Sequence, residues 1–449
     1  MKPIYIPISL WLAQCFTAGD SPEGLLNISA NAMPEKFTTS ITATDAIVEK
    51  NRAGAKSTTI SFELKQKMSA DEQSIQALLD HYYPQAELPG AALAVVKDGK
   101  PLYVGAKGVG NLEKGTPLSI NSTFRMASVS KQFTALAIFR LIQVDILTHN
   151  TRLEEIFKDL HPEVGQVTIG QLLNHTSGLW DYESLIPSDQ KEQVTDADVL
   201  RWVNAQGKTY FPPGTAFRYS NTGFCILAHI VEHYAKIPYA DFMYYTIFRP
   251  MGLDLGQGWA YMYQKDKTLP NRNFGYAMKR DGATKASPIG GLTTGNGKVG
   301  GGTVSDFRFA DQSITSATKG DGCVYISAEG YLKWGEAIRV ASNGAVSAPI
   351  TRDYINAILS HQYPVKDGVS YSHGWFVVAK PGSTVLFHSG ETTGFRNMVY
   401  HHLEKGISVS VFANRDDETI GDLFEEVLQV LGEQKPVNKR MFQWMSEVY

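Results

Sequence analysis

The sequence has few cysteines, little net charge and no long apolar run, and each shortage excludes a class of protein. Its 449 residues include only Cys15, Cys225 and Cys323, an odd number at spacings that match no zinc framework, so a disulfide scaffold is not expected. The formal net charge of -3 provides no basic field for nucleic acid or an anionic membrane. No apolar run approaches the ~20 residues that a transmembrane helix needs. The composition, 43% hydrophobic and 19% charged, is instead that of a globular protein with one large core or two lobes.

The beginning of the chain has the character of a secretory signal. Lys2 precedes an apolar stretch at residues 4–13, and small residues follow. We therefore expect residues 1–18 to be a signal peptide and the protein to be secreted or periplasmic; the alternative is a start that packs on the domain. Residues 19–68 are rich in Ser, Thr, Ala and Asn, which favours a linker or irregular extension.

Short β-rich runs lie toward both ends of the remaining sequence. Residues 91–96 and 101–104 flank a turn at Asp98-Gly99 and are typical of a hairpin. Three further runs, separated by Gly-containing turns, lie at residues 384–388, 397–401 and 407–413. A stripe of apolar residues at helical spacing follows them over residues 417–431. The sequence between residues 128 and 371 is mostly helical or Gly/Pro-rich. This order predicts an α+β fold, in which an antiparallel sheet built from both chain ends is flanked by helices and carries an inserted, mainly helical lobe.

The predicted domain covers residues 69–433, and residues 434–449 form a C-terminal tail. The tail contains Met441, Phe442, Trp444 and Met445, which suggests that it docks on the domain surface. No function for the tail follows from the sequence.

The first candidate for chemistry is a Ser-x-x-Lys pattern at Ser128 and Lys131. If a helix starts near Ser128, Lys131 lies one turn later on the same face, within reach of the serine hydroxyl. Serine needs a neighbouring base to become a nucleophile, and lysine can be that base where its pKa is lowered. The free N–H groups of a helix N-terminus add positive potential at the nucleophile.

The same pattern occurs twice more, at Ser188 with Lys191 and at Ser316 with Lys319. Both copies lie in polar stretches and are expected to be exposed. An apolar helical stripe that includes Phe133 follows only the Ser128 copy, so we assign the nucleophile to Ser128.

Two further elements lie later in the chain. Tyr219 and Asn221 are spaced so that a phenol can shuttle protons beside a lysine while the amide binds a substrate amide. The run His388-Ser389-Gly390-Glu391 ends an apolar strand, and its small residues let a substrate lie against the strand backbone. His388 and Ser389 point to opposite faces of that strand, which argues against a Ser–His catalytic pair.

These three elements, in this order, resemble those of the β-lactamase-like serine hydrolases, a group that includes class C β-lactamases, DD-peptidases, D-aminopeptidases and family VIII esterases. The resemblance extends over roughly residues 69–431. It includes segments similar to conserved structural motifs of the group at residues 171–179, 211–214 and 322–329.

The resemblance implies a role for each residue. Ser128 would be acylated, Lys131 would be its base, Tyr219 would act as acid and base for the leaving group, and Asn221 would orient the acyl amide. His388, Ser389, Gly390 and Glu391 would line the substrate site. The backbone N–H groups of Ser128 and Glu391 would form the oxyanion hole, each contributing on the order of 3 kcal/mol to lowering the barrier.

Two departures from class C β-lactamases bear on the substrate. His388 stands where those enzymes have lysine, and Glu391 stands where carboxylate-binding members often have Ser or Thr. Losing a cation and gaining a carboxylate both weaken recognition of a substrate carboxylate, although Arg396 lies near enough in sequence to compensate. We therefore expect hydrolysis of a peptide, D-amino-acid or ester substrate, and less β-lactam hydrolysis.

A non-catalytic or stalled penicillin-binding or structural member of the same fold is the alternative. The complete set of Ser, Lys, Tyr and Asn argues against it. The expected partner is a small-molecule or peptide substrate, with no nucleic acid, no transmembrane segment, no metal and no cofactor.

Overall fold

The computed structural model describes residues 68–253, 258–259, 269, 271–279, 303–345 and 349–449. Residues Ala70–Tyr449 form one compact unit. The predicted signal peptide (1–18) and all but the last residue of the predicted linker (19–68) lie outside the described residues. Within the described part, no helix has the length and apolar character to cross a membrane.

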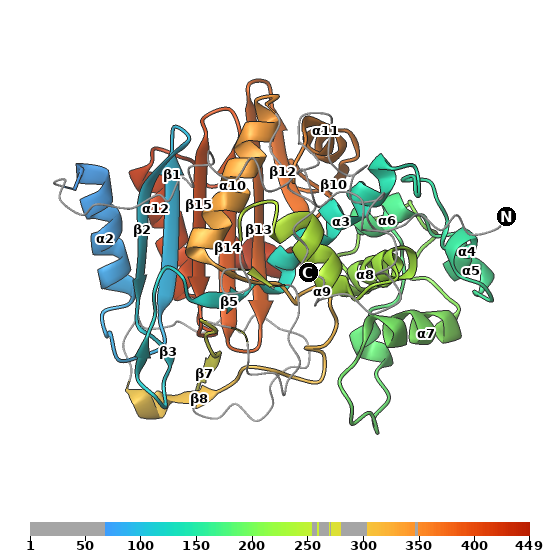
Figure 1. The fold of residues 1–449 in the computed structure, drawn as a ribbon, viewed down its shortest axis with the longest axis horizontal. Helices are drawn as coiled ribbons and strands as arrows, with labels where there is room; N and C mark the ends of the chain where they lie inside the picture. The colour runs from blue at the N-terminus through green and yellow to red at the C-terminus, as the bar shows by residue number, and fades with distance from the viewer. Residues whose placement is uncertain (1–67, 254–257, 260–268, 270, 280–302, 346–348) are drawn as a thin grey trace, which may run out of the picture. The chain divides into compact units, whose positions relative to one another are not determined.

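An eight-stranded sheet forms the centre of this unit, and every neighbouring pair of strands in it is antiparallel (Figure 1). Its strands, in spatial order, are β10 (Tyr363–Lys366), β11 (Val369–Ser372), β12 (Trp375–Lys380), β13 (Ser383–Thr392), β14 (Phe395–His402), β15 (Ile407–Ala413), β1 (Ala91–Lys97) and β2 (Lys100–Lys107). The first strand of the described residues thus pairs with the last, in a register that sets Ala91 opposite Ala413. The predicted sheet built from both chain ends is confirmed.

Helices cover both faces of the central strands. In Figure 1, α10 (Ala328–Ser342) lies in front of the sheet and α12 (Thr419–Val430) lies behind it. α2 (Ala70–Tyr82) packs against α12 and against β2, the strand at one edge of the sheet. Because both faces are covered, all residues of β15 are buried, including two serines. The buried serines explain why the sequence of this strand, ISVSVFA, alternates in its first half although both of its faces are covered.

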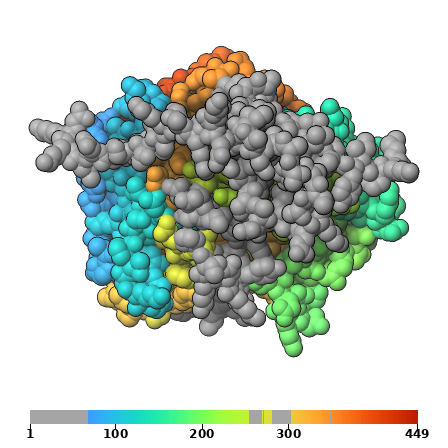
Figure 2. All heavy atoms as spheres, in the orientation of Figure 1, coloured from blue at the N-terminus to red at the C-terminus, as the bar shows by residue number. Residues whose placement is uncertain are grey.

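The segment between β2 and β10 carries the inserted helices and some short strands. Its helices are α3 (Lys131–Gln143), α4 (Leu153–Ile156), α5 (Pro162–Gly165), α6 (Ile169–Leu173), α7 (Asp196–Gln206), α8 (Asn221–Ala235), α9 (Tyr239–Met243), α10 and α11 (Arg352–Ser360), with single turns η5 (Ala127–Ser130), η6 (Tyr182–Leu185), η7 (Tyr244–Phe248) and η8 (Val304–Asp306). Its strands are β3 (Val109–Asn111) with β4 (Thr116–Pro117), β5 (Thr123–Arg125) with β9 (Tyr325–Ser327) and β6 (Gly258–Trp259), and β7 (Tyr276–Met278) with β8 (Phe307–Phe309). After α12, the chain ends in α13 (Met441–Val448). In Figure 2, the blue and cyan residues of α2 and the first hairpin lie on one side and the green residues of the inserted helices on the other.

Three sheet strands, β10 to β12, were not expected. The sequence up to residue 371 suggested helices and loops, and no strand was assigned at β12, residues 375–380. β10 contains Pro364 and is only partly buried, so it shows no apolar run. The signal that does mark these strands is the Asp367-Gly368 turn between β10 and β11, where both residues have positive φ, as a tight hairpin requires.

Candidate active site

Ser128 lies in a single helical turn, η5, at the point where β5 leads into α3. Its neighbours in the turn are buried, whereas Ser128 is partly exposed. The preceding residue, Ala127, has a φ of 48°, a left-handed conformation that costs energy for any residue with a side chain. The sharp turn at Ala127 directs the serine out of the core. Its N–H also lies in the first turn of the helix, where no intrahelical acceptor exists.

Side chains from distant parts of the chain hold this turn in place. Asn397, on β14, donates from Nδ2 to the Arg125 carbonyl at 2.9 Å. Arg125 in turn donates from Nε to the Gly322 carbonyl at 3.3 Å. The Val324 N–H donates to Ser130 Oγ at 3.0 Å. Ser128 is therefore positioned by the central sheet on one side and by the segment before β9 on the other.

Lys131, the first residue of α3, is fully buried and faces Ser128. Its Nζ lies within hydrogen-bond distance of Ser128 Oγ at 2.9 Å, Asn221 Oδ1 at 2.8 Å and the Asp321 carbonyl at 3.0 Å. Burial lowers the pKa of Lys131 to about 8, against opposing effects that include the Asp321 and Glu183 carboxylates. A pKa of about 8 leaves roughly a tenth of the amine neutral at pH 7, so Lys131 is able to accept the serine proton.

Asn221 connects Lys131 to a buried carboxylate. It begins α8, and its Nδ2 donates to Glu183 Oε1 at 2.8 Å while its Oδ1 accepts from Lys131. Burial raises the pKa of Glu183 to about 7, an effect that the bond from Asn221 opposes. These contacts hold the Asn221 amide in one orientation, with its oxygen toward the lysine.

Tyr219 lies against both the lysine and the aromatic residues around it. Its ring centre is 5.0 Å from Lys131 Nζ and 4.3 Å from the His175 ring. Its buried hydroxyl makes no hydrogen bond of acceptable geometry to the described residues. Burial, together with Tyr449 and Tyr371, raises the pKa of Tyr219 well above its usual value, while the Ser128 hydroxyl has the opposite effect. Tyr219 is thus a protonated phenol beside the nucleophile, able to donate to a departing group.

Strand β13 passes directly beside the nucleophile turn at Gly390. A Cβ added to Gly390 would lie 2.1 Å from the Met126 carbonyl oxygen and 3.3 Å from Asn397 Nδ2. Only glycine allows this approach, which brings the next residue, Glu391, close to the turn that carries Ser128. The close approach of the two backbone segments is compatible with the predicted oxyanion hole between the Ser128 and Glu391 N–H groups.

We expect Gly390→Ala to push β13 away from the nucleophile turn. The clash with backbone predicts a loss of about 2 kcal/mol or more in the free energy of unfolding, together with a large fall in activity. Denaturant unfolding and kcat/KM measure the two effects. Gly322→Ala is the matched control, because its Cβ would make only ordinary contact with Ala127 Cα, at 3.6 Å. If Gly390→Ala unfolded and turned over like the control, the close approach would have no consequence.

The structure places His388 within the core. It has no exposed surface; its Nδ1 lies 2.5 Å from the Ser389 carbonyl and its Nε2 lies 3.1 Å from the Tyr371 hydroxyl. Burial lowers the pKa of His388 to about 3, so the ring is neutral at physiological pH. With both ring nitrogens engaged, His388 does not offer the direct substrate contact that the sequence suggested. It supports the site through Tyr371 and Ser389.

Glu391 and Arg396 face each other across the β13–β14 hairpin. They are register partners, and Arg396 Nε lies 3.5 Å from Glu391 Oε2. Burial raises the pKa of Glu391, which Arg396 opposes. Arg396 also donates to the carbonyls of Thr392 and Phe395. Arg396 is therefore occupied within its own hairpin and is not positioned as a free partner for a substrate carboxylate.

The rival Ser-x-x-Lys patterns differ in their surroundings. Ser188 and Lys191 are exposed, as expected. The expectation of exposure was wrong for Ser316, which is buried and accepts from Arg125 at 2.7 Å. It was also wrong for Lys319, which pairs with Glu232 at 2.5 Å. Polar residues are buried where partners satisfy them, and those partners lie far away in the sequence.

Several residues around the site were not assigned roles from the sequence. Glu183, Asp321, Tyr371 and Tyr449 all contact one of the predicted residues or lie beside it. Each of these four residues lies far in the sequence from the residue that it contacts, so no local sequence motif links the two.

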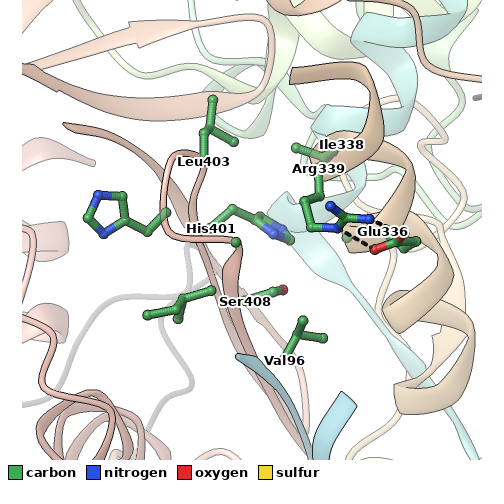
Figure 3. A pocket seen from close by; sticks show the side chains of 11 residues that line it. Val96, Glu336, Ile338, Arg339, His401, Leu403 and Ser408 are labelled. Atoms are coloured by element: carbon green, nitrogen blue, oxygen red, sulfur yellow. Dashed lines mark hydrogen bonds and ion pairs between the residues drawn. The ribbon is translucent and has the colours of Figure 1, made fainter. Parts of the chain in front are cut away.

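A small pocket elsewhere in the fold is not a substrate site. It is lined by residues of β1, α10, β14 and β15, including Arg339, His401 and Ser408 (Figure 3). Its volume of about 10 Å³ holds at most one water molecule. Among the described residues, no group of His, Cys, Asp and Glu side chains is arranged to hold a metal ion.

Comparison with known proteins identifies relatives over most of the chain. The family model described as Beta-lactamase matches residues 72–430. Penicillin-binding protein 4* of Bacillus subtilis is 26% identical over 360 residues, which are 77% of this chain and 72% of that protein. A D-aminopeptidase of Cereibacter sphaeroides is 24% identical over 383 residues, which are 85% of this chain and 67% of that protein.

Solved structures show the same fold. The D-amino acid amidase from Ochrobactrum anthropi SV3, complexed with L-phenylalanine amide, superimposes with a TM-score of 0.63 at 19% identity, covering 81% of this chain and 99% of that one. The octameric penicillin-binding protein homologue from Pyrococcus abyssi gives a TM-score of 0.62 at 20% identity, covering 81% and 78%.

Proposed function

The chain belongs to the Beta-lactamase family, and we propose that it hydrolyses its substrate through an acyl-enzyme on Ser128. The relatives named penicillin-binding protein and D-aminopeptidase support a serine hydrolase-type activity. The observation that carries this proposal is the contact between Ser128 Oγ and the fully buried Lys131, whose pKa is lowered to about 8. A buried lysine with a lowered pKa beside a partly exposed serine is the pairing that nucleophilic catalysis needs.

The proposed reaction begins with proton transfer. Neutral Lys131 takes the Ser128 proton as Oγ attacks the substrate carbonyl, and the N–H groups of Ser128 and Glu391 stabilise the oxyanion. Tyr219 donates its proton to the leaving group as the bond to the carbonyl carbon breaks, and Lys131 restores that proton. Water then attacks the carbonyl carbon of the ester on Ser128. The water proton passes through Tyr219 and Lys131 to Ser128 Oγ as the bond between Oγ and the acyl carbon breaks, which releases the acid and restores the free enzyme.

For the substrate, we propose a D-aminoacyl amide or a short ester with a free amino group. The charges around the site support an ammonium group better than a carboxylate: His388 is neutral, Arg396 is occupied, and Glu183 and Glu391 are carboxyl groups. The names of relatives agree with this class, because they include D-aminopeptidase and D-amino acid amidase. Hydrolysis of penicillins, whose carboxylate would find no free cation among these residues, is expected to be slow.

The test combines intact-protein mass spectrometry with a substrate panel. Wild type incubated with a fluorophosphonate is expected to gain one adduct that Ser128→Ala does not form. D-phenylalanine amide is expected to be hydrolysed with a higher kcat/KM than its L-enantiomer and than N-succinyl-D-phenylalanine amide, which lacks the ammonium group. Absence of both adduct and turnover would indicate a non-catalytic member, and a stable adduct with substrate would indicate one that stalls after acylation. Either result would overturn the proposal.

A further inference from the structure

The tail of the chain packs against the domain through an apolar helix face. α13 buries Met441, Phe442, Trp444 and Met445. Phe442 lies so close to α12 that a Cβ on Gly421 would come within 2.6 Å of its ring. The Met441 N–H donates to Glu425 Oε1 at 2.7 Å. The helix is therefore a part of the folded unit.

Trp444 sets the helix over the strands that carry the site. Its ring centre lies 5.3 Å from Phe376 on β12 and 6.0 Å from Phe387 on β13. Its Nε1 donates to Asp367 Oδ2 at 3.0 Å, and Glu447 pairs with Lys366. These contacts determine both the position and the direction of α13, and they point its last turn toward the end of β13 that contains Ser389.

Tyr449, which follows α13, reaches the proposed active site. Its N–H bonds the Met445 carbonyl at 2.9 Å, so its backbone continues the helix. Its hydroxyl lies 2.7 Å from Ser389 Oγ, and its ring centre lies 4.3 Å from that of Tyr219. The end of the described chain, marked C in Figure 1, accordingly lies beside β13. The Tyr449 ring packs on Tyr219 and Phe376 and forms one wall of the site, while 39% of the residue as a whole stays exposed.

We propose that Tyr449 is a specificity-determining residue that limits the size of the leaving group. The inference rests on the proposed function, in which Tyr219 protonates the leaving group and must therefore contact it. A leaving group that accepts a proton from the Tyr219 hydroxyl must lie beside the Tyr219 side chain. The Tyr449 ring occupies part of that space, because it is in van der Waals contact with the Tyr219 ring. A small alcohol or ammonia fits beside that ring, whereas a bulky aromatic leaving group collides with it.

The hydroxyl contact with Ser389 strengthens the wall. This contact holds the phenol against β13. Its partner is Ser389, a residue that the sequence predicted to contact substrate. Burial raises the pKa of Tyr449, so the phenol remains neutral and adds no charge to the site. Its effect on substrates is therefore expected to be steric, and phenylalanine should preserve it.

The test compares leaving groups at a constant acyl group, using the methyl, phenyl and 2-naphthyl esters of D-alanine, which carry the free amino group of the proposed substrate class. Because kcat/KM covers the steps through acylation, in which the leaving group departs, we compare the 2-naphthyl to methyl ratio of kcat/KM between enzymes. Tyr449→Ala is expected to raise this ratio roughly tenfold, the scale of discrimination by one small steric contact in a pocket. Tyr449→Phe is expected to keep it within about twofold of wild type.

Two controls separate this inference from a general effect of the tail and from the proposed function. Across the p-nitrophenyl esters of D-alanine and of bulkier D-amino acids, the leaving group is constant, so the dependence of kcat/KM on the acyl group should be the same in wild type and Tyr449→Ala. An unchanged leaving-group ratio in Tyr449→Ala, or an equal rise or fall for all esters, would overturn the role of Tyr449 while leaving Ser128-dependent hydrolysis intact. If Ser128→Ala hydrolysed the esters as fast as wild type, the proposed function itself would fail.

Discussion

Replacing Ser128 by alanine is expected to lower kcat/KM for amide or ester hydrolysis by at least about 10⁴-fold, the scale seen when a nucleophile is removed from a catalytic unit. The fold should be almost unaffected. Ser128 is partly exposed, and Lys131 retains Asn221 and the Asp321 carbonyl when the serine hydroxyl is removed. We therefore expect the free energy of unfolding to change by less than about 1 kcal/mol.

The sequence itself provides the control for this experiment. Ser188 has the same spacing to a lysine, Lys191, but both residues are exposed. Ser188→Ala should leave kcat/KM and the thermal midpoint as in wild type. Activity in Ser128→Ala close to that of Ser188→Ala would exclude Ser128 as the nucleophile. A loss of activity accompanied by unfolding would be visible by circular dichroism and would be a different result from the one expected.

Replacing Lys131 by methionine is expected to lower kcat/KM by about 10³- to 10⁴-fold or more, since the base acts as one unit with the nucleophile. Methionine fills a similar volume without a proton acceptor for Ser128. It also leaves Asn221 Oδ1 and the Asp321 carbonyl without their donor, at a cost of about 1–3 kcal/mol each if no water replaces it. Stability and activity are measured together, with Lys191→Met as the exposed control. Near-normal turnover by Lys131→Met would assign the base elsewhere.

The pH dependence of kcat/KM provides an independent test of the role of Lys131 as the base. Lys131 must be neutral to accept a proton, and its pKa is about 8. In wild type, kcat/KM should therefore rise about tenfold per pH unit below pH 8 and level off above it. Glu183 has a pKa of about 7, so the profile reports the coupled pair rather than one isolated group.

Glu183→Gln should move that profile to lower pH. The Glu183 carboxylate favours the protonated form of Lys131, so its removal lowers the lysine pKa and makes the base available at lower pH. Glu192→Gln, at an exposed position nearby in sequence, serves as the control and should not shift the profile. A shift of the Glu183→Gln profile to higher pH would contradict the electrostatic role given to Glu183.

The sequence determined the parts of this protein that depend on residues close together in the chain. Alternating or continuous apolar runs predicted β1, β2, β13, β14 and β15, because a strand buried on one or both faces must show its burial in its own residues. The spacing of Ser128 and Lys131 predicted their contact, because residues three apart on a helix share a face. Order along the chain also indicated that the first and last strands would pair in one sheet, which β1 and β15 do.

Only the tertiary structure decided the environment of those residues. Lys131 has its lowered pKa because the surrounding core excludes water from it. The Asp321 and Glu183 carboxylates, which lie far away in the sequence, oppose that lowering, and no local pattern reports either effect. Burial likewise made His388 neutral, and Ser316 is a buried structural residue although its neighbours in the sequence are polar.

The tail shows the same division most clearly. Its apolar residues indicated from sequence that it would dock, because such side chains are more stable away from water. That it docks over β12 and β13, and that Tyr449 consequently meets Ser389 and Tyr219, depends on contacts across 60 residues or more of chain. Hydrophobic burial is non-directional, so composition predicts that a segment packs, whereas the shape and register of the folded sheet decide where.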